Sequence, residues 1–270
     1  MLEKTELVVL GTGHATVTKC YNTCFILKSN KTSLLIDAGG GNGILRQLNK
    51  AEICLDSLDG VFVTHAHTDH LLGVLWVIRM IAQAIINGKI KKKFYIYSHH
   101  KVLHLLSFIC GETLPKEYVY LFEKEIEFRE LLHDEHINIG DLKLHFFDIN
   151  STKETQFGFR ATLPDNKILV CLGDEPYKEQ LFPFAQNVDW LLHEAFCLYK
   201  DRLIYKPYEK NHGTALDAAR IAERLEVKNL LLYHTEDNNL ENRKCTYTEE
   251  VRQVFSGNIY VPDDLERIVL

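Results

Sequence analysis

The stretch that decides the fold is Thr64–His70, THAHTDH, which holds three histidines and one aspartate in seven positions. An apolar run rich in β-branched residues, GVFV, precedes it and predicts a buried strand. The residues after it, DHLLGVLWVIRMIAQAIING, have apolar side chains at helical spacing and end in a glycine, which predicts a helix. The motif therefore lies on a strand-to-helix turn, and so dense a set of imidazole and carboxylate groups indicates a metal site.

Strand-like and helix-like runs alternate along the whole chain, which is typical of an α/β fold. Further helices are predicted in NGILRQLNKA, KVLHLLSFIC, TALDAARIAERLEV and TYTEEVRQVF. Strands are predicted in ELVVLG, CFILKS, SLLIDAGGG, KFYIYSH, LKLHFFDIN, FGFRATL, NKILVCLGDE, DWLLHEAF, KNLLLYHTE and NIYVP. The basic run GKIKKK is interpreted as a solvated helix end. No strong repeat or linker interrupts this pattern, so residues 1–270 are predicted to form a single domain.

The composition is that of an ordinary globular protein. Of the 270 residues, 46% are apolar and 25% charged, and the net charge of −6 does not favour polyanions. The seven cysteines are scattered without a CxxC pair, which favours free thiols in a reducing compartment. No membrane span is expected, since no run of about 18 apolar residues is evident. The first residues are acidic where a signal peptide would be basic. We therefore expect a cytoplasmic protein without membrane contact.

Residues of the metal-ligand type also follow other predicted strands. Asp174 follows ILVCLG and His234 follows NLLLY, while His193 and Glu194 follow DWLL. Buried strands of an α/β protein end at one rim, where ligands usually bind. A lone residue of this kind could be a helix cap or a packed core histidine. Their repeated occurrence beside THAHTDH favours a metal centre.

The spacing within the motif predicts the type of centre. His65 and His67 are two residues apart and can bind one cation from the same side, whereas Asp69 and His70 can bind a second. Asp174 can bridge the two, because a carboxylate has two oxygens. Such nitrogen and oxygen ligands suit Zn²⁺, with Mn²⁺ or Fe²⁺ as alternatives. Two adjacent cations can hold a hydroxide as nucleophile, so the spacing predicts a hydrolase.

These motifs resemble those of the metallo-β-lactamase superfamily, and most closely its ribonuclease Z branch and related phosphodiesterases. VVLGTGHA, LLIDAGGG, THAHTDHLLG, CLGDE, LLHEAF and residues 211–236 carry the resemblance, with Phe196 in place of the branch's threonine. The resemblance implies a four-layer αββα sandwich, the metallo-β-lactamase fold, with the site at the rim of both sheets. The resemblance implies the same metal ligands as the spacing does, and it adds His234 as a further ligand of the second metal.

The resemblance also implies roles beyond metal binding. Asp69 would orient the bridging water. His212 would donate a proton to the leaving oxygen or stabilise the transferring phosphoryl group, with Glu194 holding its tautomer. This Glu–His pair favours phosphodiester over β-lactam chemistry. The alternative for His212 is a solvated residue before a helix.

The family's third histidine on the first metal is absent. It should stand about six residues before a GY or GF strand, and here the matching stretch before Phe157–Phe159 is DINSTKETQ. Ser151 or Thr152 stands in its place, and neutral hydroxyls bind divalent cations poorly. Asp148 and Asn150 are alternatives, and His145 is interpreted as a packing residue. The first site is therefore predicted to bind weakly or through water.

A second departure concerns the substrate. Ribonuclease Z proteins commonly carry a long basic arm for the tRNA elbow, between the third-histidine strand and the bridging aspartate. Here about twenty residues separate Thr152 from Asp174, and they are predicted to form a hairpin. tRNA is therefore not the expected substrate. A small-molecule or short nucleotide phosphodiester, such as a cyclic or modified nucleotide, is expected instead.

Other functions stay open from the sequence. A thioester, lactone or other ester hydrolase could use the same hydroxide. A ligand-binding or regulatory protein could have kept the fold with a degenerate site, and the missing histidine is the argument for it. A homodimer through the apolar helix after His70 is implied by the resemblance alone.

Overall fold

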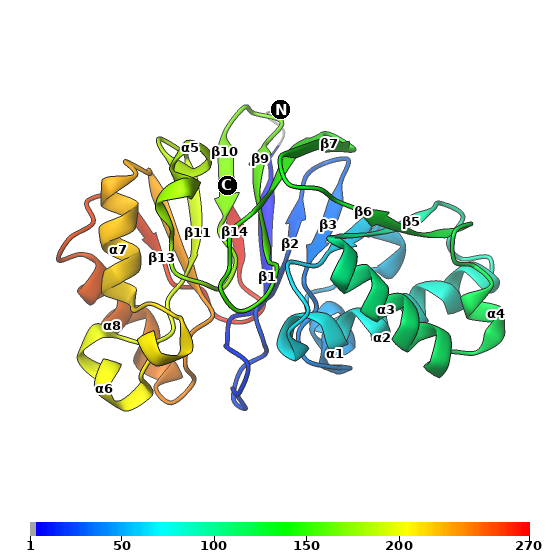
Figure 1. Cartoon of the computed structure of the whole chain (residues 1–270), viewed down its shortest axis with the longest axis horizontal. Helices are drawn as coiled ribbons and strands as arrows, with labels where there is room; N and C mark the ends of the chain where they lie inside the picture. The colour runs from blue at the N-terminus through cyan, green and yellow to red at the C-terminus, as the bar shows by residue number, and fades with distance from the viewer. Residues whose placement is uncertain (1–3) are drawn as a thin grey trace.

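The computed structural model describes residues 4–270 and contains two seven-stranded sheets. Figure 1 shows the sheets in the centre, with α1–α4 covering one outer side and α5–α8 lying on the other. The layers follow in the order helix, sheet, sheet, helix (Figure 1), as the resemblance to the metallo-β-lactamase superfamily implies. The two ends of the described chain lie near each other, because β14 pairs with β1 and Leu270 N donates to Thr5 O.

Each sheet is antiparallel on one side and parallel on the other. In sheet order, the first consists of β14 (Arg267–Val269), β1 (Glu6–Gly11), β2 (Cys24–Lys28), β3 (Ser33–Ile36), β4 (Gly60–Phe62), β5 (Phe94–Ser98) and β6 (Ile126–Glu130). The second consists of β13 (Asn258–Tyr260), β12 (Asn229–Tyr233), β11 (Trp190–Glu194), β10 (Ile168–Cys171), β9 (Phe157–Thr162), β8 (Leu142–Asp148) and β7 (Glu135–Ile139). Pairing is parallel from β3 to β6 and from β10 to β13.

Helices close both outer faces. They are α1 (Gly43–Lys50), α2 (Thr68–Ile86), α3 (His100–Thr113), α4 (Lys116–Val119), α5 (Phe182–Ala185), α6 (Arg202–Tyr205), α7 (Ala215–Arg224) and α8 (Leu240–Val251). α7 begins with a capping box, in which the Thr214 hydroxyl accepts from Asp217 N and the Asp217 carboxylate accepts from Thr214 N. This cap fixes the start of the helix at Ala215, and His212 lies two residues before the capping threonine.

Apolar side chains fill the three spaces between the four layers. Along β1, Leu7 and Val9 face the space between the sheets, whereas Val8 and Leu10 face the helices. This alternation is the two-residue period of a strand. Because helices and the opposite sheet cover both faces, the central strands are continuous apolar runs, which is why the sequence shows them clearly.

Three strands, three short helices and one helix boundary differ from the sequence prediction. The short helices α4, α5 and α6 have four residues each, too few to show a helical period of apolar residues. β6, β7 and β14 are edge strands and mix charged with apolar residues, so no apolar run marks them. α8 begins at Leu240 rather than at Thr246. Its first turns carry the buried Arg243, whose guanidinium donates to the hydroxyls of Thr12 and Thr235 at 3.0 and 2.9 Å. A buried cation in place of an apolar residue hides the helical period there.

One helix has the length and the apolar composition of a segment that could span a membrane. α2 is long and apolar enough to do so over Thr68–Ile86. Half of its apolar window is buried within the protein, and Val74, Val77 and Ile78 pack in the core beneath the first sheet. A core helix passes the same test of length and composition, so the helix is weak evidence for a membrane.

Candidate metal centre

Asp37, directly after β3, fixes the loop that connects β4 to α2. Thr64 donates to the Asp37 carboxylate from its amide and from its hydroxyl, both at 2.8 Å. His70 Nδ1 lies 2.7 Å from the same carboxylate, which turns the other ring nitrogen of His70 toward the predicted ligands. The sequence analysis missed Asp37. Asp37 could have been predicted from the sequence, because it directly follows a buried strand as the predicted ligands do.

Close packing of α2 against the loop after β3 positions Asp69 and His70. Gly73 N donates to Gly39 O at 2.7 Å, and Ala38 N donates to His70 O at 3.0 Å. A Cβ on Gly73 would lie 1.8 Å from Ala38 O. The glycine of the DHLLG sequence is therefore required for the helix to start this close to the site.

The structure brings the six predicted metal ligands together in two groups. In the first, His65 Nε2 lies 2.8 Å from His67 Nδ1 and 3.5 Å from Asp174 Oδ2. In the second, Asp69 Oδ2 lies 3.3 Å from His70 Nε2 and 3.5 Å from His234 Nε2. The ligand atoms within each group lie within 4.8 Å of one another.

Asp174 connects the two groups. Its Oδ2 lies 3.6 Å from His70 Nε2 and 3.5 Å from His234 Nε2, in addition to its contact with His65. One carboxylate oxygen thus faces histidines of both groups, from a position directly after β10. This is the geometry of a bridging ligand.

The chemistry of the cluster fits divalent cations. His70 Nε2 and both ring nitrogens of His234 are buried without a hydrogen-bond partner, since the nearby carboxylate oxygens do not have hydrogen-bond geometry. Each such buried group costs about 1–3 kcal/mol. Burial lowers the pKa of His65 and so keeps it neutral. Neutral imidazoles with free lone pairs are the form that cations bind.

The carboxylates of the cluster stay ionised. Burial by itself would raise the pKa of Asp69 and Asp174, but the surrounding histidines hold both well below their usual range. The pKa of His70 is raised, against the effect of burial, by Asp69 and Asp37. This shift reflects negative charge that the protein leaves uncompensated and that a cation would neutralise.

The position of the absent third histidine is filled by other contacts. Within residues 4–270, no side chain from 148–156 belongs to either ligand group. Ser151 donates to Glu175 at 2.6 Å, and the Thr152 hydroxyl accepts from Asn211 at 3.3 Å. Gln156, which the sequence analysis missed, donates to Asp174 Oδ1 at 2.6 Å. It thereby leaves the other oxygen of Asp174 free to face the histidines.

Glu194 and His212 form a buried pair beside the ligands. Glu194 Oε2 lies 3.7 Å from His212 Nδ1, and neither atom has a hydrogen-bond partner. Gly213 N donates to the other oxygen of Glu194. Burial raises the pKa of Glu194 to about 7 and lowers that of His212. His193 Nδ1, in contrast, lies 2.7 Å from the carbonyl oxygen of Glu194, and the residue does not belong to either ligand group.

Residues 5–257 match the family described as anti-Pycsar protein Apyc1. The chain belongs to the Apyc1 family. It is also similar to ribonuclease Z from Ignicoccus hospitalis, with 26% identity covering 100% of this chain and 99% of that protein. Zinc phosphodiesterase ELAC protein 2 from Macaca fascicularis is 28% identical over 85% of this chain and 29% of that protein. The predicted resemblance to ribonuclease Z is confirmed, and so is the class of metal-dependent hydrolase acting on phosphodiester bonds.

Solved structures confirm the fold of this Apyc1-family chain. The metallo-β-lactamase fold protein YhfI from Bacillus subtilis matches with a TM-score of 0.74 and 20% identity, covering 99% of this chain and 100% of that one. A diphosphatase of the PhnP family matches with a TM-score of 0.74 and 19% identity, covering 100% and 98%. The chain therefore has the metallo-β-lactamase fold that the histidine motif predicts.

In this Apyc1-family chain an aromatic stack forms one wall of the site. Phe196, which replaces the threonine of the ribonuclease Z motif, lies between His14 and His212, with ring centroids 4.4 and 4.9 Å away and planes within 17° and 16°. Burial lowers the pKa of His14 to about 4, so its ring is neutral. The sequence analysis did not single out His14. The stacking contact with Phe196 fixes the plane of the His212 ring.

A cavity of about 410 Å³ opens over the cluster. It is lined by Ala15, Ala66, His67, Thr68, Asp69, Lys153, Asp174, Lys210, His212 and His234. Two of these are lysines, although the chain as a whole is acidic. The cavity therefore presents positive charge next to the ligands, which suits a small anionic substrate.

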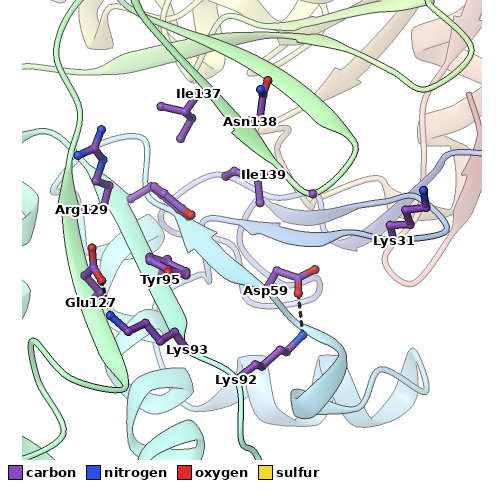
Figure 2. Close-up of a pocket in the computed structure, with 12 residues that line it drawn as sticks. Lys31, Asp59, Lys92, Lys93, Tyr95, Glu127, Arg129, Ile137, Asn138 and Ile139 are labelled. Atoms are coloured by element: carbon purple, nitrogen blue, oxygen red, sulfur yellow. Dashed lines mark hydrogen bonds and ion pairs between the residues drawn. The ribbon is translucent and has the colours of Figure 1, made fainter.

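A larger cavity lies elsewhere. Figure 2 shows it between β5, β6 and β7, with a volume of about 610 Å³. Lys92 and Lys93 of the GKIKKK run line it and pair with Asp59 and Glu127. Asp59, Lys92 and Lys93 come before strands of the first sheet and Glu127 lies on β6. The loop with the predicted metal ligands, in contrast, comes after β4. This cavity is therefore not the predicted site.

Proposed function

We propose that the protein hydrolyses a small-molecule or short nucleotide phosphodiester, such as a cyclic or modified nucleotide. The position of Asp174 Oδ2 between histidines of two ligand groups carries the proposal. The short connection between β9 and β10 supports a small substrate, because Leu163 N donates to Lys167 O in a tight hairpin where a tRNA-binding arm would stand. The cavity over the cluster and its two lysines also favour a small anionic substrate.

We assign the roles as follows. His65, His67 and Asp174 would hold one divalent cation, and Asp69, His70 and His234 a second, with Asp174 shared; Zn²⁺ suits these ligands, with Mn²⁺ or Fe²⁺ as alternatives. Such ions lower the pKa of water and polarise phosphoryl oxygens. Asp69 would accept a hydrogen bond from the attacking water and orient it. His212, held by Glu194 and Phe196, would protonate the leaving oxygen or stabilise the phosphoryl group.

Three other expectations belong to this proposal. The chain would act in the cytoplasm, as one domain over residues 1–270. A homodimer through α2 would follow the resemblance. None of these is needed for the chemistry, because every assigned side chain comes from one chain.

Purified protein is expected to cleave bis-p-nitrophenyl phosphate and to leave thioesters and lactones intact. The reason is the buried Glu194–His212 pair, whose imidazole would stabilise the transferring phosphoryl group or protonate a leaving oxygen that needs a proton. Release of p-nitrophenolate and of free thiol measures the two activities. Faster turnover of the thioester would replace this proposal with an ester hydrolase, and no turnover of either would favour a binding protein.

Protein purified without added metal is expected to contain nearer one ion than two per chain. The second group has three ligands of its own, and the shared Asp174 completes it. The first group has two histidines and the shared Asp174, and it lacks the family's third histidine. Elemental analysis of the purified protein gives the number directly. Two tightly held ions would show that a side chain outside the assigned set completes the first site.

A further inference from the structure

A second cluster of metal-ligating side chains lies on the outer face of β7 and β8, separate from the catalytic groups. His136 and His145 are directly opposite each other in this antiparallel pair. Leu144 and Phe146 point into the core between the sheets, so the two histidines face outward. Asp134 precedes β7 in a left-handed conformation with φ 66°, and its Oδ1 lies 2.6 Å from His145 Nε2.

The ring of His145 is held from three directions. It stacks on His136 with centroids 3.8 Å apart and planes within 18°. Phe184 packs against it at 5.2 Å, and Asp134 contacts its Nε2. The ring of His145 is therefore held in place before any ligand binds, which lowers the entropic cost of binding. His136 and Asp134 are exposed, so an ion has direct access.

The electrostatic surroundings favour neutral imidazoles. Two protonated rings stacked at this distance would repel each other. Burial lowers the pKa of His145, and His136 adds to this effect against the opposing contact with Asp134. Arg160, opposite His145 on β9, donates to the carbonyl of Phe184 at 2.6 Å, and its positive charge also lowers the pKa of His145. A neutral imidazole offers the lone pair that a metal ion needs.

We propose that Asp134, His136 and His145 bind a divalent transition-metal ion such as Zn²⁺. One nitrogen from each histidine and one carboxylate oxygen lie within 4.8 Å of one another, so small side-chain rotations bring all three to a common ion. Two nitrogens and one oxygen match Zn²⁺, Ni²⁺ or Cu²⁺, whereas Mg²⁺ and Ca²⁺ prefer oxygen ligands. The ion would cross-link β7, β8 and the turn before them at the edge of the second sheet.

The test is an ion count on the full-length protein. Protein freed of metal with a chelator is dialysed against Zn²⁺ and the bound ions are counted by atomic absorption. The wild type is expected to bind one ion per chain more than His136→Gln, and Asp134→Asn to weaken that ion's binding at least about tenfold. Asn138→Ala, two residues along β7 on the same face, is the matched control and should keep the ion.

Equal ion counts in the wild type, His136→Gln and Asp134→Asn would overturn the proposal and leave an Asp–His pair. Loss of the ion in Asn138→Ala as well would also overturn it, because binding would then depend on the hairpin and not on these ligands. Hydrolysis should be unchanged in His136→Gln, since this residue lies outside the catalytic groups. Crystals soaked in Zn²⁺ should show zinc-edge scattering between the three side chains, and scattering only at other places would contradict the assignment.

Discussion

Replacing Asp69 with alanine is expected to abolish phosphodiester hydrolysis, with kcat/KM falling by at least about 10²–10³-fold, the usual cost of removing one group that stabilises a transition state. Asp69 is buried and contacts both His70 and His234. Its removal takes away one assigned ligand and the group that would orient the attacking water. Steady-state kinetics with bis-p-nitrophenyl phosphate, together with metal analysis, measure both effects.

The matched control for this variant is Asp56→Ala. Asp56 is an exposed aspartate on the short 3-10 turn before β4, so its loss should leave turnover and metal content unchanged. Unchanged turnover in Asp69→Ala would contradict the assigned site and point to a contaminating activity or to a different centre. Circular dichroism of both variants separates a chemical effect from loss of the fold.

Replacing His212 with alanine is expected to lower kcat on a phosphodiester with an alkoxide leaving group by about 10²–10⁴-fold, the usual contribution of a positioned general acid. The metal content should stay at the wild-type level, because the two assigned ligand groups do not need this residue. Glu194→Gln should give a smaller loss, since Glu194 acts only through the orientation of His212. Kinetics of both variants with metal analysis alongside give the comparison.

The leaving group decides between the two roles open to His212. An alkoxide needs a proton to leave, whereas p-nitrophenolate does not. If His212 donates the proton, the loss in His212→Ala should be large with an alkyl ester of phosphate and small with bis-p-nitrophenyl phosphate. Equal losses with both substrates would assign His212 to stabilisation of the phosphoryl group. Full activity of His212→Ala on both substrates would remove it from the catalytic machinery.

The sequence by itself determined the fold and the set of predicted ligands. Strands covered on both faces are continuous apolar runs, and ligand-type residues at their ends meet at one rim in an α/β fold. His65, His67, Asp69 and His70 are neighbours along the chain, so their spacing shows directly that they can share a site. Asp174 and His234 are predicted to lie at the same rim because they follow buried strands in the same way, and the resemblance implies that His234 is a ligand.

Only the tertiary structure decided which side chains hold these ligands in place. Asp37 contacts His70 across 33 residues of sequence, and Gln156 approaches His65 across 91. The edge strands and the early start of α8 could not be predicted for a related reason. Their side chains suit contacts with distant segments, and these contacts leave no local periodic pattern in the sequence. A local sequence pattern indicates which face of a strand or helix is apolar. It does not indicate which polar side chain of another, distant strand will contact that element.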